Sequence, residues 1–162
     1  MASVISLGLS SIQVGTAAPT GTFPGTTTKL GMVYQDTCKM VQAAPEVTEF
    51  YEEGYAVPAV KRSKKKVPIL TFSIMDPDPI ALAAYVGGAV TTGVWGYDGS
   101  EAVAAVAIKV VTKQGLDIEI PNADIQALIN ATYSEKGLFL VDFTVTPLSV
   151  SAGKPIMALP HV

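Results

Sequence analysis

Histidine and cysteine, the residue types that most often act as bases and nucleophiles in enzymes, occur once each in this 162-residue chain. His161 is the penultimate residue, where a solvated chain end is a simpler expectation than a catalytic base. Cys38 lies in a segment with strand character, and a free cysteine there is most often a small buried apolar side chain. A serine or cysteine nucleophile would have no second histidine to use as its base. We therefore expect no enzymatic activity.

The remaining polar motifs are typical of turns and helix starts. Asp76 and Asp78, in Asp-Pro-Asp-Pro, offer two carboxylates, fewer oxygen ligands than a calcium loop needs, and a helix start accounts for both. Residues 96–99 are turn residues next to Trp95 and lack a phosphate-binding glycine pattern. Trp95 could stack on a ligand, but packing before a turn is the simpler role. We expect no metal and no cofactor.

Charge is sparse in most of the chain and concentrated between residues 46 and 66. Four glutamates precede a turn-like segment at 54–58, and five of the eleven basic residues follow it. A hairpin would place an acidic strand beside a basic one. The candidate contact residues are Glu49, Glu52, Glu53, Tyr55, Pro58, Lys61, Arg62, Lys64, Lys65 and Lys66.

Three interpretations of this charged hairpin stay open from the residues alone. It could be a solvated face whose ion pairs are worth at most ~1 kcal/mol each. It could be an arm whose charges set the register against a neighbouring copy. Nucleic-acid binding by the basic strand is the third, and the adjacent acidic strand disfavours it.

The overall composition favours a protein whose surface is partly covered by partners. Apolar residues make up 49% of the chain and charged residues 15%, below the ~25% usual for soluble domains. A net charge of −3 disfavours a phosphate-binding face. The start of the chain lacks the basic segment of a signal peptide, and the apolar stretch at 80–94 is too short to span a bilayer. We expect a cytosolic or particle-borne soluble protein.

Apolar residues at every second position predict a mainly β fold. The alternation predicts strands at 69–74, 103–112, 116–120 and 138–145, with a tight turn at Gln114-Gly115. Residues 122–133 fit one helix face but also alternate. Thr132, Tyr133 and the following Ser-Glu-Lys-Gly turn favour a strand of a hairpin there.

One helix and two extended terminal segments complete the expected fold. Asp76 can cap the helix, Pro77 suits its first position, and Gly87-Gly88 can end it. Residues 14–28 are rich in glycine, threonine, alanine and proline and predict an arm that is mobile in a free subunit. We expect an N-terminal strand and flexible arm (1–29), an antiparallel β-sandwich or barrel with one flanking helix (30–150) and a C-terminal tail (151–162).

Several motifs, taken in order, resemble the major tail tube proteins of long-tailed bacteriophages, above all the short tube proteins of phages with Bacteroides-like hosts. The motifs span roughly residues 30–150, and no single one is specific. They are VTEFYEEG at 47–54, Pro58, KKKVP at 64–68, LTFSI at 70–74, DPD at 76–78, the run at 82–88, IEIPNA at 118–123 after Gly115, KGL at 136–138 and TPL at 146–148.

The resemblance implies a tail-tube-type β domain whose six copies form a ring, and rings that stack into a hollow tube conducting DNA as non-specific cargo. It also implies a place in the virion tail, assembly in the host bacterial cytoplasm, contacts with other tail proteins and no membrane. Tubes of contractile injection machines and type VI secretion share this fold. Two alternatives stay open: a capsid decoration or other virion component, and a ligand- or carbohydrate-binding β-sandwich.

Overall fold

The computed structural model describes residues 3–102 and 104–162, and this part of the chain is mainly β with one short helix. Eight antiparallel strands form the main sheet in the order β2-β1-β9-β10-β11-β6-β3, with β12 paired to β10. The predicted antiparallel β class is confirmed. The strands are β1 (Leu7–Thr16), β2 (Thr28–Lys29), β3 (Lys39–Val41), β6 (Ile69–Ile74), β9 (Ala104–Gln114), β10 (Leu116–Ala131), β11 (Phe139–Pro147) and β12 (Met157–Pro160).

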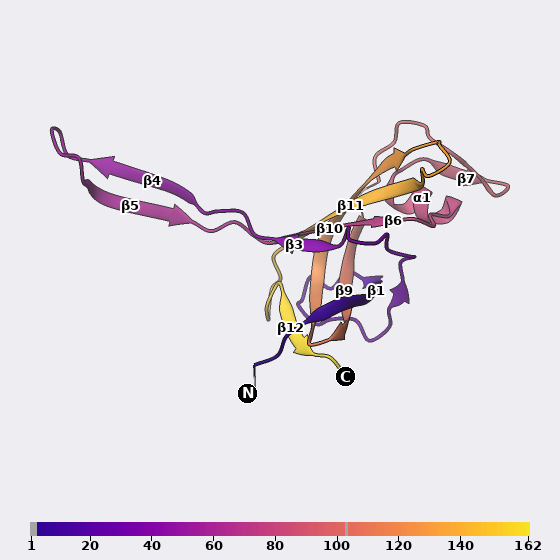
Figure 1. Cartoon of the computed structure of the whole chain (residues 1–162), viewed down its shortest axis with the longest axis horizontal. Coiled ribbons are helices and arrows are strands. Elements are labelled where there is room, and N and C mark those ends of the chain that lie inside the picture. The colour runs from indigo at the N-terminus through magenta and orange to yellow at the C-terminus, as the bar shows by residue number, and fades with distance from the viewer. Residues whose placement is uncertain (1–2, 103) are drawn as a thin grey trace.

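The long strand β10 belongs to both halves of this sheet. Its first part pairs with β9 and β12, and its second part pairs with β11. The register with β9 shifts between Ile120 and Ala123, around Pro121, whose nitrogen cannot donate to the ladder. Figure 1 shows β9 and the first part of β10 running at a steep angle to β11 and β6. The strand predicted at 122–133 is confirmed, as is the turn at Gly115, whose φ is 105°.

The core lies between the two halves of the sheet. Leu70, Phe72 and Ile74 of β6 are 2%, 2% and 3% exposed, which confirms the predicted alternation. Phe72 stacks on Phe143 of β11 with a centroid distance of 5.1 Å. The remaining buried strand residues of this cluster are β-branched or small, as paired strands favour: Ile12, Ile108, Val110, Ile120, Ala123, Ile125, Ala127, Val141 and Val145.

Helix α1 (Pro79–Tyr85) covers one side of this core and begins two residues later than predicted. Asp78, not Asp76, caps it, because its Oδ1 accepts a hydrogen bond from Ala81 N at 2.7 Å. Asp76 instead accepts one from Met32 N at 2.6 Å. Tyr85 meets Phe143 edge to face at 5.6 Å. The helix ends before Gly87-Gly88, both with positive φ, as predicted.

Both terminal segments take part in the main sheet. The first three residues of the predicted arm at 14–28 lie in β1, and the following loop is tied to the body through Ala18 N donating to Pro121 O at 2.8 Å. The predicted C-terminal tail contains β12, which pairs with β10 from Leu116 to Glu119. A strand this short has too little alternation to be recognised, and its pairing partner lies about 40 residues earlier in the chain.

Residues 30–34 form a strap that joins the two ends of the sheet. Leu30 N donates to Ile12 O of β1 at 2.9 Å, and Tyr34 N donates to Ser73 O of β6 at 2.8 Å. Between them Met75 N donates to Met32 O at 2.9 Å. The strap therefore hydrogen-bonds to β1 at one end of the sheet and to β6 near the other.

Candidate interaction site

The charged segment forms a two-stranded antiparallel hairpin that projects far from the body (Figure 1). Its strands are β4 (Glu46–Tyr51) and β5 (Pro58–Lys64), and within the part of the chain that the structure describes they pair only with each other. A second, smaller two-stranded sheet, β7 (Ala89–Thr91) and β8 (Val94–Gly96), instead contacts α1. The predicted hairpin at 46–66 and its turn are confirmed.

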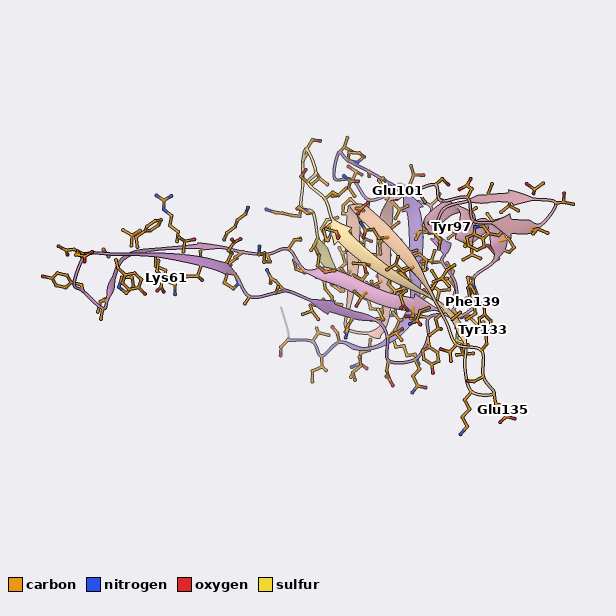
Figure 2. All side chains as sticks on the ribbon, turned by 90° about the horizontal axis from the view of Figure 1, so that it is seen from above. Lys61, Tyr97, Glu101, Tyr133, Glu135 and Phe139 are labelled. Carbon is orange, nitrogen blue, oxygen red and sulfur yellow. The ribbon has the colours of Figure 1, made fainter. Side chains whose placement is uncertain are left out.

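The register places basic residues opposite acidic ones at two positions. Glu46 is opposite Lys64 and Glu49 is opposite Lys61, whose side chain is labelled in Figure 2. Directly opposite residues share one face of a ladder. One face carries Glu46, Thr48, Phe50, Val60, Arg62 and Lys64, and the other carries Val47, Glu49, Tyr51, Pro58, Lys61 and Ser63.

Neither face of the hairpin has a core beneath it. All residues of β4, and all residues of β5 except Pro58, are exposed. The exposed residues include large apolar and aromatic side chains: Phe50 and Val60 are 53% and 51% exposed, and Tyr55 and Val57 are 66% and 76% exposed. A lone two-stranded hairpin is marginally stable in water, and three or more strands with a packed face are normally needed.

The ion pairs within the hairpin are few. Among the residues that the structure describes, its one Lys–Glu ion pair joins Lys66 Nζ to Glu46 Oε2 at 3.1 Å, and both side chains are well exposed. Glu49 accepts a hydrogen bond from the Tyr51 hydroxyl, which raises the Tyr51 pKa. Such exposed contacts contribute little to stability.

The charge of the hairpin also changes along its length, from acidic at the tip to basic at the base. Its tip, residues 50–60, carries Glu52 and Glu53 and no lysine or arginine. The rest of the hairpin carries five basic residues, Lys61, Arg62 and the lysines at 64–66, against the two glutamates Glu46 and Glu49. Gln42 Nε2 donates to Lys66 O at 2.7 Å where the two chain segments meet. Of the acidic contact candidates, Glu49 is paired with Lys61 of the same hairpin, whereas Glu52 and Glu53 lie between β4 and β5 and have no lysine opposite them in the ladder. A lysine partner for Glu52 and Glu53 therefore has to be sought on a neighbouring copy.

Away from the hairpin, the most buried charged group is Asp117, which sequence reasoning did not single out. Its carboxylate accepts hydrogen bonds from Thr112 N at 2.8 Å and Thr112 Oγ1 at 3.0 Å, and His161 Nδ1 lies 3.2 Å away. Burial raises the pKa of Asp117, but the hydrogen bonds from Thr112 and His161 outweigh it and hold the pKa below its usual value. His161 remains at the exposed chain end, as expected, but its ring is held against Asp117 instead of being free in solvent.

Trp95 and Cys38, the other residues that the sequence singled out, make contacts that stabilise the fold. Trp95 Nε1 donates to Gly87 O at 2.8 Å, which ties β8 to the helix end. Cys38 is half-buried, and burial raises the pKa of its thiol, which lowers its reactivity. Within residues 3–102 and 104–162, no three histidine, cysteine or acidic side chains are grouped to hold a metal ion, and no helix is long and apolar enough to cross a membrane.

No protein-family model matches this chain, and a search of curated protein sequences finds no significant match. The functional argument therefore rests on the geometry and chemistry of the chain itself.

Proposed function

We propose that this protein is a structural, non-enzymatic protein of the phage tail tube type, in which six copies form a ring and rings stack into a hollow tube. The observation that carries the proposal is the projecting hairpin β4–β5, which pairs with no other strand of residues 3–102 and 104–162 and exposes apolar side chains on both faces. In the proposed tube these side chains are covered by neighbouring copies.

Burial of the hairpin in an assembly removes an energetic cost that a monomer bears. Fully burying a large apolar side chain gains about 1.5–3 kcal/mol. Phe50, Val60, Tyr55 and Val57 are all at least half exposed in the single chain. A contact that covers several of them supplies a driving force for association, while the charged residues beside them fix its register.

The body of the protein is compatible with the fold that the resemblance implies. Its described residues form one main antiparallel sheet around a core, one helix on one side of that core, and the short strands β2 and β3 at the two ends of the sheet. Closed ring symmetry covers strand edges that a monomer leaves exposed. We include in the proposal that this β fold is a sandwich of the tail-tube type.

One face of the sheet suits a channel through which DNA passes. The strands β6, β10 and β11 contain no lysine or arginine. On the face away from the core, Asp142 accepts hydrogen bonds from Ser73 Oγ and from Asn130 Nδ2, and Asp124 lies on the same face of β10. DNA is held mainly by basic groups, so a neutral or acidic wall lets it slide.

A hairpin-shortened variant tests the proposal. Replacing residues 47–63 by a short glycine-serine turn removes a segment that pairs only with itself, so the body keeps its fold, near-normal circular dichroism and melting temperature. We expect wild-type protein to sediment as polymers at high concentration and the variant to remain small. Polymers of both proteins would contradict the role of the hairpin. A wild type that stays monomeric but melts higher with an oligosaccharide would support the ligand-binding alternative.

A further inference from the structure

An open groove of about 620 Å³ lies on the body between β1 and the segment that leads into β3. Gly8, Leu9 and Ser10 form one wall, and Met32 and Tyr34 of the strap form part of the other. Two exposed lysines, Lys29 from β2 and Lys113 from β9, and one carboxylate, Asp36, border it. The groove is therefore net basic with apolar parts.

The groove follows an unfinished edge of the sheet. Strand β1 pairs with β9 from Leu7 to Thr16, but β2 pairs with β1 only at Gln13 and Val14. Within the described residues, no strand pairs with the first five residues of β1, Leu7 to Ser11, on the side away from β9. A strand edge with unpaired N–H and C=O groups accepts an added extended segment.

We propose that this groove receives the hairpin tip, residues 50–60, of a second copy of the chain. This inference rests on the proposed function and names the surface that the hairpin contacts. The tip carries Glu52 and Glu53 without a basic residue, which complements Lys29 and Lys113 in the groove. Its exposed tyrosines and Val57 match the apolar wall of Leu9, Met32 and Tyr34.

The occupant has to be another molecule. Figure 1 shows the hairpin extending away from the body, whereas β1 lies within the body beside β9, so the tip does not reach the groove of its own chain. The contact is heterologous, because the tip of one copy meets a different surface on the next. Such contacts close into rings or continue as filaments, which a stacked tube requires.

Charge reversal tests the pairing. One variant carries Glu52→Lys with Glu53→Lys at the tip, a second carries Lys29→Glu with Lys113→Glu in the groove, and a third carries all four changes. We expect each two-residue reversal to raise the concentration needed for assembly at low salt by about tenfold, and the four-residue variant to restore it to within about threefold of wild type. All four positions are exposed, so folding is preserved in each variant.

A matched control reverses Glu135→Lys with Lys136→Glu in the exposed turn between β10 and β11, where Figure 2 labels Glu135. This variant is expected to assemble like wild type. Normal assembly of the groove variant, equal loss in the control, or no recovery in the four-residue variant would overturn the pairing while leaving the proposed function in place. A wild type that never assembles would instead refute the proposed function and this inference together.

Disulfide cross-linking tests the contact between the tip and the groove by a measurement that does not depend on charge. Ser10→Cys in one protein and Glu53→Cys in another, both in a Cys38→Ala background, place one thiol in the groove and one at the tip. Mixed polymers are expected to form a disulfide between the two proteins under mild oxidation. Glu135→Cys in place of Glu53→Cys is the control, and equal cross-linking by both would contradict the proposed contact.

Discussion

Replacing Asp117 by alanine removes the acceptor that fixes the end of β9 to the start of β10 and to the C-terminal segment. The carboxylate is 7% exposed and accepts two hydrogen bonds from Thr112. Hydrogen bonds to charged groups contribute about 1.5–3 kcal/mol, and a partner left unsatisfied by the truncation costs about 1–3 kcal/mol. Because the turn at Gly115 lies near the surface and water can replace part of the bonding, we expect a loss of about 2–3 kcal/mol.

Urea unfolding followed by circular dichroism measures this loss, since a shifted midpoint at constant slope reports stability alone. Two controls separate the contributions. Asp117→Asn keeps an oxygen that can accept from Thr112 but removes the charge, and we expect it to lose about half as much as alanine does. His161→Ala leaves Thr112 bonded and tests the C-terminal contact by itself.

The same carboxylate makes stability depend on pH. Its pKa in the folded protein is below the ordinary value of 3.8, so the unfolded chain takes up the proton first as the pH falls. Its stabilising contribution is complete well above pH 3.8, declines through that value and is lost below the folded pKa. The Asp117→Asn variant should lack this component. An alanine variant within 0.5 kcal/mol of wild type, with an unchanged acid profile, would refute the reasoning.

Three further predictions concern the core, the helix start and the hairpin base. Phe143→Ala removes the ring between Phe72 and Tyr85, and urea unfolding should show a loss of about 3–5 kcal/mol; a loss below 1 kcal/mol would contradict the packing described. Asp78→Ala should cost about 1 kcal/mol through loss of the helix cap; a calorimetric melting temperature equal to wild type would count against it. Reversing the lysines at 64–66 to glutamate should leave the circular dichroism near normal but prevent the polymer formation that light scattering detects. Reversing the facing glutamates to lysine in the same protein should partly restore polymer formation. If the folded reversed protein polymerises normally at low salt, these lysines are a solvated face.

Local sequence patterns were sufficient to predict the longer strands of the main sheet and the hairpin. Alternation in β6 is visible because every second side chain reaches the core, and Gly115 marks a turn because its φ of 105° favours glycine. The hairpin was predictable because its charges and its turn are adjacent in the chain. Its projection from the body was not, since no local pattern states what a strand packs against.

Features that depend on distant residues escaped prediction. The sequence alone does not distinguish Asp76 from Asp78 as the residue that caps the helix. In the structure Asp76 accepts a hydrogen bond from Met32 N, 44 residues earlier, and Asp78 is the cap. Asp117 and His161 are also 44 residues apart, so neither residue type in isolation indicated their contact. The groove beside β1 arises where β2 stops pairing, which only the three-dimensional register shows.

Electron microscopy of the purified wild-type protein over a range of concentrations tests the central claim most directly. We expect sixfold rings at intermediate concentration and hollow tubes of stacked rings at high concentration, because in the proposed assembly each copy covers the hairpin and the open strand edge of another. A monodisperse monomer at every protein and salt concentration would contradict the account.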